Sequence, residues 1–256
     1  MILNLKYSHY RILKMTKTRT LLIVLKFIAV ISFIFASRQS QAQIPAGFKS
    51  IFNGKDLKGW HVSRTTHQGT TPDFRVENGI MVVRQKPYGQ GGVLLSDTKY
   101  KNFEIYLEVR VDSLTNGGIF IRSSESGIAY QVELDETSNT TGNLLGERLQ
   151  ISKEARCEGR AQIWKKDDWN SYRIRMVGEI PHITLWINGV QMWDVTQPKN
   201  DFIAGATQGM IGLQSHWTTL FSPAAGEWNG LTLWAPGATH RYRNIAIKEL
   251  DNNLKD

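Results

Sequence analysis

Cysteine is nearly absent from this chain of 256 residues, which holds only Cys157. One cysteine cannot form an internal disulfide, and a chain of this size can fold on its hydrophobic core alone. No histidine lies near Cys157 in the sequence, so it is interpreted as a structural thiol and not as a nucleophile. The scattered histidines have no zinc-site spacing, and no glycine-rich phosphate loop is present. We therefore expect no cofactor and no metal, with an oxygen-ligated ion on an acidic strand as the remaining alternative.

Long hydrophobic runs are also missing. The longest apolar stretch, Leu21–Phe35, is interrupted by a lysine and a serine and is short for a membrane span. Basic residues precede it, and Ser40-Gln41-Ala42 follows it as a small-x-small cleavage site, which is the layout of a signal peptide. We expect residues 1–42 to be removed and the protein to be secreted or periplasmic, without stable membrane insertion. The alternatives are an uncleaved anchor and a true start at Met15.

Without this leader, the chain has no large excess of positive or negative charge. Residues 1–42 hold seven of the 31 Lys and Arg and no acidic residue, so residues 43–256 carry 24 basic and 23 acidic side chains. The high isoelectric point therefore belongs to the leader, and a basic surface for nucleic acid is not expected. The oligomeric state does not follow from the sequence.

No stretch has a long helical period, whereas alternation of apolar and polar residues is common. Phe103–Val111 and Tyr172–Val177 alternate in this way, and Asn188-Gly189 joins His182–Ile187 to Val190–Val195 as a hairpin turn. Further short strands are expected at Gly92–Leu95, Gly118–Ser123, Ala129–Leu134, Met210–Gln214 and Arg241–Leu250. With 22 glycines and no linker or repeat, residues 43–256 are predicted to form one all-β sandwich or barrel domain.

Three motifs narrow the fold further. In chain order they are Phe52-Asn53-Gly54-Lys55-Asp56-Leu57-Lys58-Gly59-Trp60, Gly117-Gly118-Ile119-Phe120-Ile121-Arg122-Ser123 and Tyr242-Arg243-Asn244-Ile245-Ala246-Ile247-Lys248-Glu249-Leu250. Together they resemble the bacterial 3-keto-disaccharide hydrolase domain family. The resemblance implies a concanavalin A-like jelly roll, the sandwich of lectins and glucanases, in an exported protein that binds or cleaves sugars.

The strand expected at Tyr130–Glu136 carries the side chains best suited to catalysis or sugar binding. Gln131, Glu133 and Asp135 should project from one face of it, and Tyr130 from the other. Two carboxylates packed into a core would cost several kcal/mol, so their face is expected to be open, either as a plain solvated surface or as a sugar groove. The family resemblance favours the groove, because the family's matching stretch lies on an inner strand.

Candidate site residues follow from this strand and its expected neighbours. The predicted catalytic residues are Glu133, Asp135, His216 and Arg122, and the predicted substrate-binding residues are Gln131, Gln214, Trp217 and Tyr130. Arg122 is expected near Glu133 or Asp135, either in contact with substrate or in a structural ion pair. His216 is either a proton donor or acceptor or an ordinary hydrogen-bonded histidine at a strand end.

Two departures from the family pattern concern sugar contacts. The motif Thr141-Gly142-Asn143-Leu144-Leu145-Gly146 has Leu145 where the family has an aromatic residue. A long segment between His216 and Tyr242 contains Trp217, Trp228 and Trp234, which either stack on sugar rings or pack onto the sandwich.

Three functions compete at this stage. The resemblance implies cleavage of 3-keto-glycosides, in which a base removes the C2 proton and the enolate expels the C1 aglycone. In that reaction Glu133 or Asp135 would be the base, His216 the proton donor and Arg122 the enolate stabiliser. A retaining β-glucanase-like glycosidase would need a second acid after Glu136, where Thr137 follows instead. A non-catalytic lectin-like sugar-binding module is the third possibility.

Overall fold

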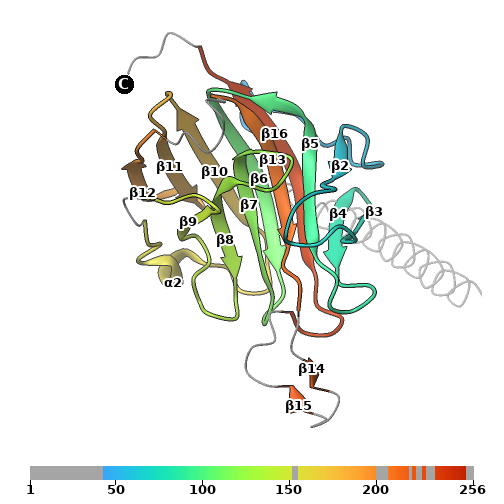
Figure 1. Ribbon diagram of the computed structural model, residues 1–256. Helices are drawn as coiled ribbons and strands as arrows, with labels where there is room; N and C mark the ends of the chain where they lie inside the picture. The colour runs from blue at the N-terminus through green and yellow to red at the C-terminus, as the bar shows by residue number, and fades with distance from the viewer. Residues whose placement is uncertain are drawn as a thin grey trace, which may run out of the picture. The chain divides into compact units, whose positions relative to one another are not determined.

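The computed structural model describes residues 43–151, 155–199, 207–218 and 234–251, together with the backbone of residues 221–222 and 227–228. The predicted signal peptide, residues 1–42, lies outside the described residues. Nearly all regular structure is β-strand, arranged in two stacked antiparallel sheets (Figure 1). The prediction of an all-β sandwich is therefore confirmed.

The larger sheet has eight strands in the order β12-β11-β10-β6-β16-β4-β3, with β1 paired to β16. The bounds of its strands are β1 Lys49–Ser50, β3 Asp73–Glu77, β4 Ile80–Arg84, β6 Phe103–Val111, β10 Asn170–Val177, β11 His182–Ile187, β12 Val190–Thr196 and β16 His240–Glu249. The predicted turn between β11 and β12 is present, with positive φ at Asn188 (51°) and Gly189 (82°). Such a turn matches the twist of the two strands it joins.

The smaller sheet carries the candidate site and has six strands in the order β2-β5-β13-β7-β8-β9. Its strands are β2 Trp60–Val62, β5 Gly92–Tyr100, β7 Asn116–Ser123, β8 Ala129–Asp135, β9 Leu144–Glu147 and β13 Gly209–Ser215. Because β13 inserts between β5 and β7, a strand from late in the chain lies beside strands from its first half (Figure 1). This crossing brings Gln214 close to the acidic strand β8.

The hydrophobic core lies between the two sheets. Ile105 and Leu107 of β6 face Ile119 of β7 and Val132 of β8 in one cluster of fully buried side chains. Alternate residues of each strand enter this cluster, as the period of two predicts. The residues between them on the smaller sheet point to its other face, which is called the outer face below.

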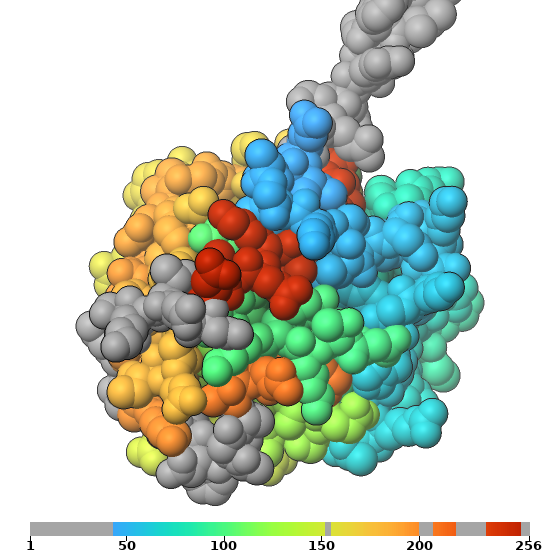
Figure 2. All heavy atoms as spheres, turned by 90° about the horizontal axis from the view of Figure 1, so that it is seen from above, coloured from blue at the N-terminus to red at the C-terminus, as the bar shows by residue number. Residues whose placement is uncertain are grey.

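Elements without a strong sequence pattern complete the fold. A short helix, α2 Arg160–Ile163, follows β9, and a two-stranded ribbon, β14 Phe221–Ser222 and β15 Glu227–Trp228, lies at one end of the sandwich (Figure 1). Seen along the sandwich, the early segments (blue to cyan) and the segments around β10 to β12 (yellow to orange) occupy opposite sides (Figure 2). Within the described ranges, no helix has the length and hydropathy needed to traverse a lipid bilayer.

Candidate active site on the outer face of the smaller sheet

The acidic strand β8 divides its side chains as predicted. Tyr130 and its alternate neighbours join the core between the sheets, whereas Gln131, Glu133 and Asp135 lie outside that core cluster. The two acids are nevertheless only 9% and 4% exposed, so this is not a plain solvated face. Tyr130 is 1% exposed within the core, and this position argues against the predicted contact between Tyr130 and a substrate.

Glu133 occupies the most unusual environment of the two acids. Burial raises the pKa of its carboxyl to about 7, and the nearby Asp135 adds to the increase while a hydrogen bond with Thr140 opposes it. A pocket of about 480 Å³ adjoins this carboxyl and also contacts Thr140 and Asn143. A carboxyl group that titrates near neutrality beside a pocket has the properties of a general base.

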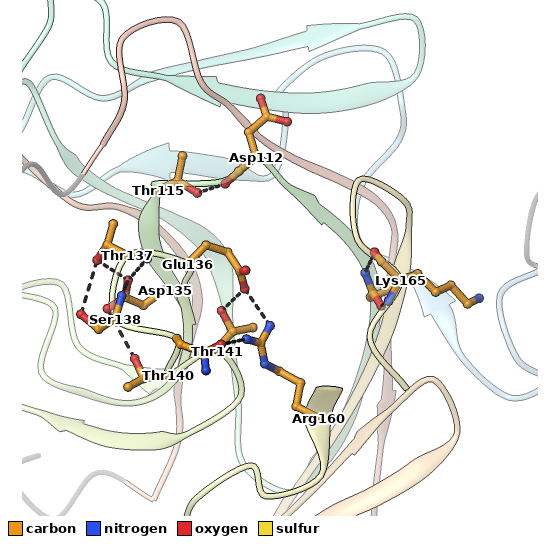
Figure 3. Close-up of polar contacts among 12 residues, drawn as sticks. Asp112, Thr115, Asp135, Glu136, Thr137, Ser138, Thr140, Thr141, Arg160 and Lys165 are labelled. Atoms are coloured by element: carbon orange, nitrogen blue, oxygen red, sulfur yellow. Dashed lines mark hydrogen bonds and ion pairs between the residues drawn. The ribbon is translucent and has the colours of Figure 1, made fainter. Parts of the chain in front are cut away.

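Asp135 has a different role, because its oxygens are occupied by its own loop. The Oδ1 atom accepts hydrogen bonds from the Thr137 amide (2.7 Å), the Thr137 hydroxyl (2.5 Å) and the Ser138 amide (3.1 Å), and Oδ2 accepts one from Thr140 (3.4 Å) (Figure 3). A carboxylate with three donors on one oxygen is held as a loop anchor. Asp135 therefore positions the loop from which Thr140 reaches Glu133.

The same loop is fixed from its far side by Glu136. The Oε1 atom of Glu136 accepts hydrogen bonds from the Thr141 hydroxyl (2.7 Å) and from Nη1 of Arg160 (2.8 Å) (Figure 3). Arg160 belongs to α2, and its guanidinium also lies 5.0 Å from the ring centroid of Trp164. Helix α2 thus ties the loop after β8 to the rest of the sandwich.

Two glutamines form a buried amide pair beside Glu133. Nε2 of Gln131 donates to the carbonyl of Gly117 (3.2 Å) and to Oε1 of Gln214 (2.8 Å). Since a backbone carbonyl only accepts, the amide of Gln131 is oriented, and with it the oxygen of Gln214. The NH₂ group of Gln214 forms no hydrogen bond with another described residue. It is therefore a preoriented donor on the same face as Glu133.

His216 directly follows β13, and the carboxylates of Glu147 and Asp135 act on it electrostatically. Its backbone amide bonds to the carbonyl of Asn116 (3.1 Å), and its Nδ1 lies 2.6 Å from the carbonyl of Trp217. That carbonyl needs a donor, so Nδ1 carries the hydrogen and the neutral ring has its lone pair on Nε2. Burial lowers the pKa of His216, although Glu147 and Asp135 oppose the decrease. Because Nδ1 donates to Trp217, Nε2 of the neutral ring is the nitrogen that can accept a proton.

A second histidine and acid were missed by the sequence analysis. His67 Nε2 lies 2.8 Å from Oε1 of Glu147, and the amide of Gln68 lies 2.9 Å from the same nitrogen. Glu147 ends β9, and His67 comes from the loop after β2, so only folding brings them together. Both groups influence the pKa of His216 electrostatically. The only available signal was a lone histidine in an irregular segment, which is too weak to identify a site.

Arg122 does not join the other candidates. Its guanidinium donates to the carbonyls of Lys101 (2.8 Å) and Gly178 (2.8 Å) and to Oδ1 of Asn102 (3.1 Å). The register places Gly118 opposite Glu133, so the expected neighbour relation between Arg122 and that acid was wrong. A positive φ of 50° at Arg122 turns the side chain out of the alternation of β7. Its contacts are those of a structural residue that is 2% exposed.

The tryptophans of the late segment fall into different classes. The Trp217 ring lies 5.1 Å from that of His216 and is partly exposed, whereas Trp234 is fully buried and donates to the carbonyl of Ala238. The side chain of Trp228 lies outside the described residues.

Among the described residues, no group of three or more His, Cys, Asp and Glu side chains has a metal-binding arrangement. Burial raises the pKa of Cys157 to about 11, which keeps its thiol protonated.

Solved structures with the same architecture come from carbohydrate-related proteins. A protein from Parabacteroides distasonis with the provisional description glycosyl hydrolase superposes with a TM-score of 0.50 at 17% identity, over 80% of this chain and 95% of that one. The Crh5 transglycosylase superposes with a TM-score of 0.52 at 11% identity, over 82% of this chain and 87% of that one. At these identities the likeness establishes the jelly-roll sandwich alone.

Sequence comparison identifies the family. A 3-keto-disaccharide hydrolase of Bacteroides thetaiotaomicron is 30% identical over 96 residues, which is 35% of this chain and about a third (33%) of that protein's length. Residues 47–248 match the 3-keto-alpha-glucoside-1,2-lyase-like domain. That match covers most of the chain and confirms the resemblance carried by the three motifs. The chain therefore belongs to the 3-keto-alpha-glucoside-1,2-lyase-like domain family.

Proposed function

We propose that this protein is an exported carbohydrate-active enzyme that cleaves 3-keto-glycosides by elimination of the C1 aglycone followed by hydration. Family membership supports the substrate class. The single observation that carries the chemistry is Glu133, a buried carboxyl with a pKa of about 7 beside a pocket. Export rests on the signal-peptide pattern of residues 1–42.

The first step uses Glu133 as a base. A carbonyl at C3 acidifies the proton on C2, and the Glu133 carboxylate takes this proton as the enolate forms. Negative charge develops on the C3 oxygen, where the free NH₂ group of Gln214 is the proposed hydrogen-bond donor. The enolate then re-forms the carbonyl, a C1=C2 double bond forms, and the C1–O bond breaks so that the aglycone leaves with its electron pair.

Hydration completes the reaction. Water adds its oxygen to C1, and we assign Nε2 of His216 as the acceptor of the water proton, because Nδ1 already donates to Trp217. The Glu133 carboxyl returns its proton to C2, which restores the starting carboxylate. The proton on His216 then passes through solvent to the departed aglycone oxygen. The net change is hydrolysis with one water consumed.

The other two hypotheses make different demands on the same residues. A retaining glycosidase needs a second carboxylate free to attack C1. Asp135 is a poor candidate for that nucleophile, because one of its oxygens already accepts three hydrogen bonds from the loop. A lectin-like module needs neither a base near pH 7 nor a proton acceptor, and it would bind sugars without turnover.

The test compares a 3-keto-glucoside with its unoxidised parent and follows aglycone release by the purified protein. Release from the keto sugar alone supports the proposal. Release from the parent as well would favour the conventional glycosidase, and sugar binding without release from either would favour the lectin-like module. Glu133→Gln should abolish release from the keto sugar, and Glu158→Gln, an exposed acid in the segment before α2, is the matched control.

A further inference from the structure

The pocket beside Glu133 has a wall of aliphatic side chains. The pocket is lined by Leu144, Leu145, Gly146, Leu149, Ile151 and Ala155, together with the polar residues Glu133, Thr140, Asn143 and Arg156. Its volume of about 480 Å³ is in the range of pockets that hold small organic groups. Among the described lining residues none carries an aromatic ring. The pocket therefore combines an aliphatic lining with the carboxyl of the proposed base and a few other polar groups.

A tight backbone contact forms this wall. A Cβ atom on Gly146 would lie 2.0 Å from the carbonyl oxygen of Leu149, so only glycine allows the chain to fold back directly after β9. The amide of Leu144 then bonds to the carbonyl of Ala155 (2.9 Å), which closes the returning segment onto the strand. Leu149 and Ala155 are also members of the main core cluster. The wall is thus continuous with the core and is preformed.

Leu145 stands out on this wall because it remains 41% exposed. It lies opposite Gln131 on the neighbouring strand, two residues along from Glu133. An exposed leucine facing a pocket gains free energy when a hydrocarbon surface displaces water from it. A second sugar would gain less at Leu145 itself, because hydroxyl groups placed against that aliphatic side chain would lose hydrogen bonds to water.

The order of the strands assigns the two ends of a substrate. Across the sheet Gln214 lies on β13, Glu133 on β8 and Leu145 on β9. In the proposed reaction the C3 oxygen needs a donor, C2 needs the base, and C1 carries the aglycone. These three carbon atoms are consecutive in the ring, so a sugar with C3 toward Gln214 and C2 at Glu133 directs its aglycone toward Leu145.

We propose that this pocket is the aglycone subsite and that it takes an aryl group, such as phenyl, in preference to a second sugar. The inference rests on the proposed function for the identity of the reacting sugar, but the binding preference of the pocket is independent of turnover. An aryl aglycone also suits the chemistry, because a phenol ionises near pH 10 and leaves as an anion more readily than a sugar alcohol. No strong proton donor is then required at the leaving oxygen.

Binding without turnover tests the pocket alone. The affinities of unoxidised phenyl and methyl glucosides for the Glu133→Gln variant are measured by calorimetry. Phenyl glucoside should bind about tenfold more tightly than methyl glucoside, as expected for one added apolar contact region. Leu145→Asn should remove this preference, and Val190→Asn, at a residue that is 45% exposed on β12 of the larger sheet and does not line the pocket, should leave it intact. Equal affinities for the two glucosides would overturn the proposal.

Turnover then separates the two claims. Wild-type protein should have a KM about tenfold lower for phenyl 3-keto-glucoside than for a 3-keto-disaccharide, and Leu145→Tyr, which restores the aromatic residue of the family motif, should reverse that order. A phenyl preference in binding without release from any keto sugar would support the pocket and reject the proposed function. Release from the keto-disaccharide with no aryl preference would do the opposite. Melting temperatures near that of wild type verify that each variant is folded.

Discussion

Gln131 and Gln214 join their side-chain amides at 2.8 Å although a whole strand separates them. Gln131 lies on β8, Gln214 on β13, and β7 runs between the two. The contact is possible because the intervening residue is Gly118, where a Cβ atom would lie 2.2 Å from Nε2 of Gln131. Gly118 therefore leaves space for the amide of Gln131. That amide in turn orients the NH₂ group of Gln214, the proposed hydrogen-bond donor to the enolate.

Gly118→Ala should consequently damage the site more than the fold. The added methyl group displaces the amide of Gln131, and Gln214 loses its fixed orientation. We expect kcat on a 3-keto-glucoside to fall at least tenfold and the free energy of unfolding to fall by about 1–3 kcal/mol. Steady-state kinetics and denaturant titration check this, and an unchanged kcat in a folded variant would contradict the role given to the amide pair.

Glu133 should leave a signature in the pH dependence of stability. Its pKa is raised in the folded state from 4.5 to about 7, so folding disfavours the charged form. The resulting decrease in the free energy of unfolding is absent below pH 4.5, grows as the pH rises, and reaches about 3 kcal/mol above pH 7. Glu133→Gln should therefore be more stable than wild type at pH 8, with the difference vanishing at pH 4. Urea titrations at both pH values measure it; equal differences would mean that the carboxyl is not buried.

Asp135 should behave as an anchor of the loop and not as a base. Asp135→Asn keeps an acceptor for the Thr137 and Ser138 amides, so we expect it to retain most of the activity. Asp135→Ala leaves those donors without a partner and should cost about 1–3 kcal/mol of stability. Comparing kcat/KM for both variants with that for Glu133→Gln distinguishes the roles. A loss in Asp135→Asn as large as in Glu133→Gln would identify Asp135 as the base.

Arg122 should matter for stability only. Arg122→Met leaves two backbone carbonyls and Asn102 without their donor, at a cost of about 3 kcal/mol. The kcat per folded molecule on a 3-keto-glucoside should stay within about twofold of wild type, because no contact joins Arg122 to Glu133 or Gln214. Kinetics at a temperature where the variant is fully folded provide the measurement. A selective loss of kcat there would return Arg122 to the list of catalytic candidates.

The signal-peptide hypothesis can be tested on the secreted product. Expression of the full chain in a Gram-negative host, followed by N-terminal sequencing of the periplasmic protein, should give Gln43 as the first residue. Ser40→Arg and Ala42→Arg together should block this cleavage and leave the longer chain attached to membranes. Recovery of uncleaved wild-type protein would instead indicate an anchor.

The sequence predicted the fold more completely than it predicted the site. Alternation located β6, β10 and β8 because alternate side chains of each strand enter the core between the sheets, and it correctly separated Glu133 from Tyr130. Alternation did not predict the direction of the Arg122 side chain, because a single positive φ moves that side chain out of the alternation.

Contacts between distant segments were the other limit. The pairing of His67 with Glu147 depends on where the loop after β2 crosses the outer face, and no local pattern encodes that path. Which ring nitrogen of His216 carries the proton depends in turn on one backbone carbonyl, that of Trp217. Such features follow from the assembled sheet and not from the type or spacing of the residues.

The segment that follows Glu133 returns to hydrogen-bond the same residue. The amide of Glu133 bonds to the carbonyl of Asn143 (3.0 Å), and the amide of Gly142 bonds to the carbonyl of Glu133 (2.8 Å). Residues 134–141 therefore form a closed excursion whose two ends meet at the proposed base. Its exposed tip, Ser138 and Asn139, can therefore vary in evolution or by engineering while Leu134, Asp135 and Thr140 keep the reacting carboxyl where it is.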